Sequence, residues 1–132
     1  CNDGTNRSDD VSLATWQLGD QQGEWCVQPI IAQSNHPTPD FGGTWWSGLD
    51  DNGWGFSVAF SGDLMVVIMY YFDSDGNPRW AQGIQPGFQV GDEITLDLLE
   101  LTGYPRDAEL TEITDVLAGT VTMTMTMMAK KQ

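Results

Sequence analysis

Residues 56–72 read FSVAFSGDLMVVIMYYF, and this stretch decides the fold class. Its first six residues alternate large apolar side chains with Ser and Ala, which is the period-two pattern of a strand with one buried face. A Gly-Asp pair then predicts a turn. Residues 64–72 are apolar on both faces, so the second strand of this hairpin should be central in a sheet or covered on its outer side.

Further strand patterns follow this hairpin. Residues 73–78, DSDGNP, predict a turn, and strands are expected at 79–84 and 93–101. Residues 120–127 alternate Thr with Val and Met, which predicts an apolar face backed by a threonine ladder. Residues 106–117 combine helical spacing of apolar residues with a β-rich composition, and we favour an extended conformation there.

The first forty residues have a different composition. Residues 1–10 are polar and predict a terminal segment or tether. Two β-like runs, 11–18 and 25–32, predict a β-hairpin arm around a turn at 19–23. Residues 33–40 hold two prolines, which favour extended backbone and predict a linker.

These segments predict an all-β fold, with a Trp-rich β-domain at residues 41–132 preceded by the hairpin arm and linker at 11–40. We expect an antiparallel meander that closes into a small barrel or a sandwich, because both arrangements remove exposed sheet edges. The chain has 132 residues, 40% of them hydrophobic, which suits one domain. Its six tryptophans are expected mainly to pack in the core and at barrel ends.

The chain is strongly acidic, since 5 Lys and Arg residues against 19 Asp and Glu residues give a net charge of −14 at pH 7. Nucleic acid and anionic lipid surfaces would repel such a chain, so we exclude partners of both classes. No apolar run reaches the roughly 18 to 20 residues that a membrane-spanning helix needs. We therefore expect no transmembrane segment.

The two cysteines allow two interpretations. Cys1 stands where Met would begin a chain, which predicts removal of a signal peptide. If that peptide was of the bacterial lipoprotein type, Cys1 carries the lipid and Cys26 is a lone thiol. If Cys1 is not acylated, it pairs with Cys26 and closes a loop of about 25 residues, which stabilises the fold by roughly 3 to 3.5 kcal/mol in the chain-entropy model. Both interpretations place the protein outside the cytoplasm.

Residues 42–83 also carry a tryptophan pattern, with G-x-W-W, then G-W-G, a hydrophobic strand, and G-x-P-x-W. The pattern resembles a Trp-rich β-repeat unit of exported Gram-negative bacterial proteins. The matching residues are Gly43, Trp45, Trp46, Gly53, Trp54, Gly55, Gly62, Asp63, Asp73, Gly76, Pro78 and Trp80. The first spacer is one residue longer than in the unit, and Ser47-Gly48 replaces the usual Asn-Pro. The unit is functionally uncharacterised, so the resemblance implies export and an all-β fold, and no activity.

The candidate ligand-binding residues are Trp46, Trp54, Asp50 and Asp51. Trp45 and Trp46 are adjacent on one expected strand, so they should face opposite sides and one of them should point outward. An outward indole beside carboxylates can stack on a sugar ring while the acids bind its hydroxyls. The sequence therefore offers a carbohydrate site here.

We predict no catalytic and no metal site. The one histidine, His36, lies in the linker, so a His-dependent triad or a zinc site is hard to build. Residues 73–77 resemble part of a calcium loop, but Gly stands at the fourth position and no Glu follows at the twelfth, so a β-turn is expected. No cofactor is expected, although Asp50 and Asp51, with the net charge, are compatible with weak Ca²⁺ binding.

These observations predict a non-enzymatic, extracytoplasmic structural protein, secreted or on the surface of a Gram-negative bacterium. Its partner is expected to be itself, as a homo-oligomer and a filament or matrix subunit, or another surface protein. The apolar strand at 64–72, the Met-rich final strand and the hairpin arm, which can dock on a neighbour's sheet edge, motivate this hypothesis. Two alternatives are a carbohydrate-binding module with a polysaccharide partner, and a lipid-anchored envelope protein, an outer-membrane lipoprotein of unknown role.

Overall fold

The computed structural model describes residues 12–27, 37, 39–104, 109 and 112–126. The chain divides into two compact units, residues 1–33 and 34–132. The sequence predictions for the polar segment at 1–10, for Cys1, for His36 and for most of the linker lie outside the described residues. In the part that is described, no helix is long and apolar enough to cross a membrane.

The first unit contains the predicted hairpin, formed by β1 (Ser12–Leu18) and β2 (Gln21–Val27) in antiparallel register. Only Gly19 and Asp20 lie between the two strands, so the turn is shorter than the predicted 19–23. Gly19 supplies the positive φ, 62°, that glycine adopts without steric cost. Gly23 belongs to β2 opposite Trp16, where an added Cβ would lie 2.9 Å from the indole. The glycine that suggested a longer turn instead makes room for a ring.

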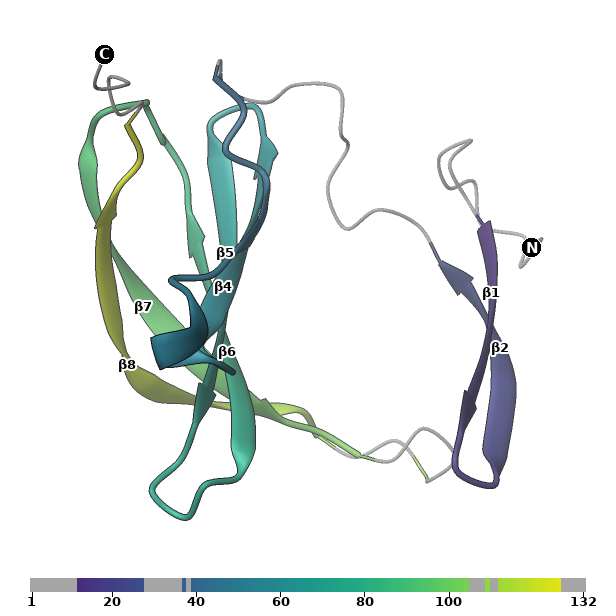
Figure 1. Ribbon diagram of the computed structural model, residues 1–132. Helices are drawn as coiled ribbons and strands as arrows, with labels where there is room; N and C mark the ends of the chain where they lie inside the picture. Colours follow the sequence, from purple (N-terminus) through teal and green to yellow (C-terminus); the bar gives the residue numbers. More distant parts are fainter. Residues whose placement is uncertain (1–11, 28–36, 38, 105–108, 110–111, 127–132) are drawn as a thin grey trace. The chain divides into compact units, whose positions relative to one another are not determined.

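The second unit is a six-stranded antiparallel sheet whose strands lie side by side in chain order (Figure 1). Its elements are β3 (Gly43–Trp45), the short 3-10 helix η1 (Leu49–Asp51), β4 (Gly55–Ser61), β5 (Leu64–Phe72), β6 (Pro78–Gln85), β7 (Glu93–Thr102) and β8 (Thr114–Thr124). The all-β antiparallel meander is confirmed. Its hydrogen-bonded order is open at β3 and β8 and does not close into a barrel.

Residues 56–72 form nearly all of β4 and all of β5, and the turn between the two strands contains Gly62 at a φ of 60°. The register pairs Val58 with Val67 and Phe60 with Met65, so alternate residues of both strands share one face, which we call the inner face. β5 lies centrally, between β4 and β6, as its apolar composition predicts. The residues on its other face are half-buried or exposed.

The core lies on the inner face and draws on strands β4, β5 and β7 and on three positions outside the strands, before β3, between β6 and β7, and directly after β8. Its buried members are Phe41, Val58, Phe60, Met65, Val67, Phe88, Leu96 and Met125. No tryptophan belongs to this cluster, and five of the six are between 42% and 56% exposed. The prediction that tryptophans fill the core is therefore wrong, because the buried strand positions hold Val, Met, Leu and Phe while Trp45, Trp46 and Trp54 lie near strand ends.

One end of the inner face is closed by the loop between β6 and β7. Phe88 is 3% exposed and packs on Phe60, with ring centroids 4.9 Å apart. Its backbone N–H donates to the carbonyl of Asp63 at 2.8 Å, and the N–H of Gly91 donates to the carbonyl of Met125 at 3.0 Å. We call this the closed end.

The last two strands are long and irregularly paired. Residues 114–117 belong to β8, so the extended conformation favoured there is confirmed, while most of 106–113 lies outside the described residues. The register between β7 and β8 shifts between Leu98 and Leu99, which is the mark of a β-bulge. β6 and β7 share a single register pair, Gln82 with Leu99.

Candidate functional site

An open pocket of about 420 Å³ occupies the other end of the inner face. Phe56 precedes Val58 by two residues on β4, and Met69 follows Val67 by two on β5, so both continue the face that carries the core. We call this region the open end and its cavity the aromatic pocket. The lining residues are Trp45, Trp46, Ser47, Asp51, Trp54, Gly55, Phe56 and Met69.

Two glycines on either side of Trp54 make this arrangement possible. Gly53 has a φ of 90°, and an added Cβ would lie 2.5 Å from the Phe72 ring. At Gly55 an added Cβ would lie 2.6 Å from the carbonyl oxygen of Trp45. The G-W-G sequence therefore lets the chain turn out of η1 and lets β4 approach the end of β3 closely.

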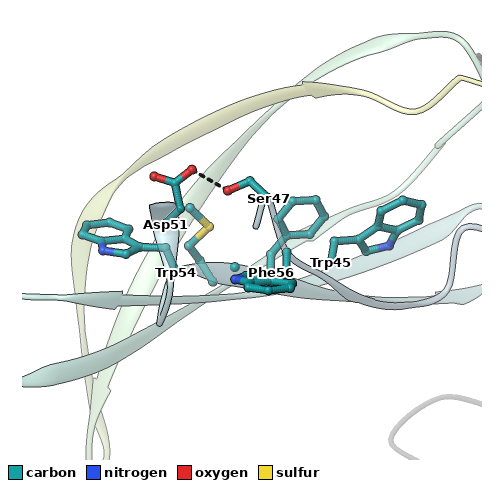
Figure 2. A pocket seen from close by; sticks show the side chains of 8 residues that line it. Trp45, Ser47, Asp51, Trp54 and Phe56 are labelled. Atoms are coloured by element: carbon teal, nitrogen blue, oxygen red, sulfur yellow. Dashed lines mark hydrogen bonds between the residues drawn. The ribbon is translucent and has the colours of Figure 1, made fainter. Parts of the chain in front are cut away.

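The pocket walls are aromatic, and other groups hold them in place. Trp45 stacks on Phe56 at an interplanar angle of 15°, and its indole N–H donates to the Phe41 carbonyl at 2.9 Å. Trp54 contacts the rings of Tyr71 and Phe72, with centroid separations of 6.2 and 6.4 Å. Figure 2 shows Trp45 and Trp54 on opposite sides of the pocket, with Phe56 between them.

The polar part of the wall is a pair of side chains, Ser47 before η1 and Asp51 at its last position. The Ser47 hydroxyl donates to Oδ2 of Asp51 at 2.5 Å (Figure 2). Asp50, the neighbouring residue, does not line the pocket. In a 3-10 turn successive side chains point about 120° apart, so only one of two adjacent acids can face a given cavity.

The structure thus brings together three of the four candidate residues, namely Trp46, Trp54 and Asp51. The prediction that Trp45 and Trp46 face opposite sides is wrong, since both line the pocket. β3 ends at Trp45, so the alternation of a strand does not extend to the next residue. Sequence reasoning missed Trp45, Ser47, Phe56 and Met69; the register of β3, β4 and β5 would have indicated three of them.

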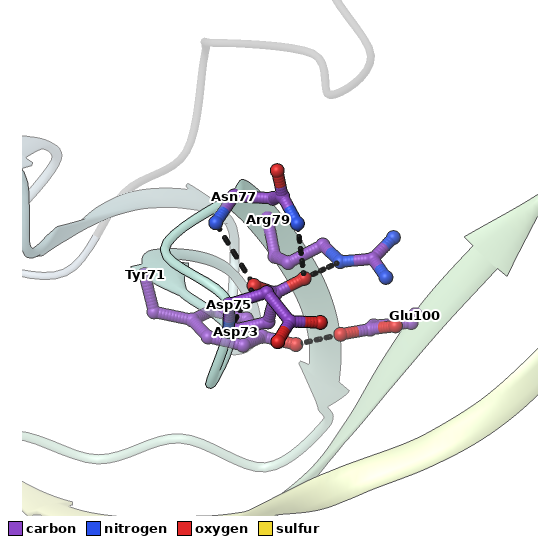
Figure 3. Close-up of polar contacts among 6 residues, drawn as sticks. All are labelled: Tyr71, Asp73, Asp75, Asn77, Arg79 and Glu100. Carbon is purple, nitrogen blue, oxygen red and sulfur yellow. Dashed lines mark hydrogen bonds and ion pairs between the residues drawn. The ribbon is translucent and has the colours of Figure 1, made fainter.

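A hydrogen-bonded pair lies beside Trp54 at the open end. The Tyr71 hydroxyl donates to the carboxylate of Glu100, which joins β5 to β7 across β6 (Figure 3). This hydrogen bond, with smaller contributions from burial and from the negative charge of Glu100, raises the pKa of Tyr71 above 10.0. The phenol therefore remains a neutral donor at physiological pH.

The turn at 73–77 is organised by the Asp73 carboxylate (Figure 3). Its Oδ1 accepts from the backbone N–H groups of Asn77 at 2.9 Å and Asp75 at 3.0 Å, and its Oδ2 accepts from Arg79 Nε at 3.1 Å. The Asn77 backbone hydrogen bond is the largest cause that holds the pKa of Asp73 below its usual range. The expected β-turn is confirmed, with Gly76 at a φ of 79°.

The remaining site predictions concern metals and cysteines. Within the described ranges, no three His, Cys, Asp or Glu side chains lie together as a metal-binding group would. Weak Ca²⁺ binding stays a prediction. Cys26 is disulfide-bonded, whereas Cys1, its predicted partner, lies outside the described residues.

Comparison of the chain with models of protein families, with curated proteins and with solved structures found no match. The resemblance to a Trp-rich unit of exported bacterial proteins therefore stays a prediction.

Proposed function

We propose that this protein is an extracytoplasmic, non-enzymatic structural protein that associates with copies of itself through the outer edge of β8. The observation that carries the proposal is the contrast between the two edges of the six-stranded sheet. β3 is three residues long, whereas β8 has eleven residues, no proline and one charged residue, Asp115. Native edge strands are usually kept short or made charged, because an unpaired edge is a template for another strand.

The partner that best fits this edge is a second β8. No described strand pairs with its outer side. Two chains of net charge −14 repel each other, and the repulsion is weakest where the contacting segments are uncharged. Residues 116–124 contain no charged side chain. Antiparallel pairing of β8 with β8 is self-complementary, as the interface of a two-fold dimer must be. It would also extend a threonine ladder in which Thr95 and Thr122 already share a hydrogen bond of 2.8 Å.

A second uncharged surface supports the proposal. The residues of β4, β5 and β6 that alternate with the inner face include no charged side chain. Trp80 and Ile84 on this face are 46% and 58% exposed. Monomeric proteins rarely leave large contiguous apolar patches in water, so this face favours further contacts between subunits, as a matrix or filament requires.

The test is sedimentation velocity over a wide range of protein concentration, with two matched variants. Thr122→Lys and Thr95→Lys remove the same hydrogen bond and add the same charge on the same face, but only Thr122 is on the edge strand. We expect wild type to dimerise, Thr122→Lys to weaken dimerisation at least about tenfold, and Thr95→Lys to weaken it much less. Added salt should strengthen association, because it screens repulsion between acidic chains.

A wild-type protein that stays monomeric at millimolar concentration would contradict the proposal. Equal weakening by both lysine variants would also contradict it, since the edge would then have no special role. Association only with a second, different surface protein would replace self-association by the other expected kind of partner.

The extracytoplasmic assignment is supported by the disulfide at Cys26, because disulfides persist mainly in oxidising compartments. Cys26 in protein taken from its native source should resist alkylation until a reductant is added. Rapid labelling without reductant would contradict this location.

A further inference from the structure

We propose that the aromatic pocket binds a small quaternary ammonium cation, a trimethylammonium group of the choline or betaine type. This inference does not depend on self-association. It is drawn from the composition of the pocket wall, from the fixed orientation of its rings and from the sign of the surrounding charge.

The wall consists mostly of aromatic rings, with tryptophan as the main component. Trp45, Trp46 and Trp54 are 42%, 56% and 46% exposed and line one cavity together with Phe56. A cation over an indole face is attracted by the negative face of the ring quadrupole, and cages of such rings are a general way to bind methylated ammonium groups. A volume of about 420 Å³ is that of a small-molecule site.

Two of the three tryptophan rings, those of Trp45 and Trp54, are oriented before any ligand arrives. The Trp45 ring is fixed by its stacking on Phe56 and by its N–H bond to the Phe41 carbonyl. Trp54 is held from behind by Tyr71 and Phe72, and Tyr71 is itself tied to Glu100. Binding therefore orders few side chains, which lowers its entropic cost.

The charge at the pocket favours a cation. Asp51 lies on the wall, and none of the described lining residues is Lys or Arg. The nearby Arg79 is paired with Asp73 at 3.1 Å. Within a chain of net charge −14, this local carboxylate attracts cations and repels anions.

A neutral sugar fits the same wall less well. Apart from the indole N–H groups, only Ser47 and Asp51 offer polar side-chain atoms, and these two already share a hydrogen bond of 2.5 Å. The hydroxyls of a sugar that face this wall would lose water without gaining a partner, which is costly. A primary ammonium group has the same difficulty with its three N–H donors. A trimethylammonium group has no N–H to satisfy, and the loss of water around its charge is offset by the ring faces and by the Asp51 carboxylate.

The test is isothermal titration of the protein with choline and with its uncharged carbon analogue, in which a tert-butyl group replaces the trimethylammonium group. The two ligands have nearly the same shape and differ in charge. We expect choline to bind at least about tenfold more tightly, because only the charged group gains the cation–π and carboxylate attractions. A panel of neutral mono- and oligosaccharides is titrated in parallel.

Variants locate the site. Trp46→Ala should abolish measurable choline binding, whereas Trp25→Ala, which removes a similarly exposed tryptophan from the hairpin unit, should leave it unchanged. Asp51→Asn should weaken choline but not the uncharged analogue. Circular dichroism of each variant shows that the fold is retained, and Asp51→Asn keeps the test valid if loss of Trp46 disturbs the loop.

Three results would overturn the proposal. Equal affinity for choline and the uncharged analogue would show that charge is not recognised. Binding of a saccharide without binding of choline would establish the carbohydrate site instead. Equal loss of choline affinity in Trp46→Ala and Trp25→Ala would place binding elsewhere.

Discussion

The closed and open ends of the inner face share strands β4 and β5, but one end is buried and the other is open to water. At the closed end Val58 and Met65 are buried, whereas at the open end, on the same strands and face, Phe56 and Met69 are only half-buried. The closed end has the Phe88 loop over it, and the open end does not. The difference teaches that strand alternation selects the face, while a loop decides whether that face becomes core or pocket.

Removing the ring that covers the closed end should have the largest effect. Phe88→Ala should lower the free energy of unfolding by about 3–5 kcal/mol, because it deletes a buried aromatic side chain and leaves a cavity against Phe60. Urea denaturation measures this loss. Phe56→Ala is the control, since Phe56 is only half-buried on the inner face at the open end and its loss should cost clearly less. Equal losses would mean that the two ends do not differ in packing.

A comparison within one strand sharpens the contrast. Met65 and Met69 both lie on the inner face of β5, four residues apart, and Met65 is fully buried. Met65→Ala should cost about 2–5 kcal/mol, and Met69→Ala about 1 kcal/mol, because water already reaches the pocket. Thermal unfolding of the two variants gives the ranking. A reversed order would contradict the assignment of the dry and wet ends.

The smallest expected effect concerns pH at the open end, where the Asp73 turn joins β5 to β6. The pKa of Asp73 is lowered in the folded protein, so its hydrogen bonds stabilise the fold above the unfolded-state pKa. This stabilisation is lost as pH falls through the lower, folded-state pKa. Asp73→Asn should therefore flatten the acid side of the stability profile measured by denaturation at several pH values.

The control for this effect is Asp75→Asn, which keeps the backbone N–H that Asp73 accepts. Its acid profile should stay closer to that of wild type. An unchanged profile in Asp73→Asn would show that the carboxylate does not hold the turn. The closed end relies on apolar packing, so Phe88→Ala should shift the profile downward without changing its shape.

The strands of the sheet were predictable because alternation and turn glycines act locally. Residues 56–72 alone specify β4, β5 and their turn, and Thr–Met alternation specifies the inner face of β8. The tryptophans were not predictable in the same way. Their burial depends on whether a loop covers them, and Trp46 lies one residue beyond the end of β3, where the alternation rule no longer holds.

The candidate site was predictable only in part for a similar reason. Trp46, Trp54 and Asp51 could be chosen because large aromatic and acidic residues cluster in one short segment. Phe56 and Met69 read as ordinary strand residues, and only the pairing between strands brings them to the pocket. Asp50 does not line the pocket, and sequence alone does not give the rotation of η1 that separates it from Asp51.

The single register pair between β6 and β7 has a mechanical consequence. β5 and β6 match at eight positions and β7 and β8 at ten, whereas β6 and β7 match only at Gln82 and Leu99. Under a pulling force the sheet should part at this seam before it parts between β5 and β6 or between β7 and β8, separating four strands from two. The loop that carries Phe88 crosses the seam and is hydrogen-bonded on both sides of it, so it acts as a tether that limits how far the two parts can separate.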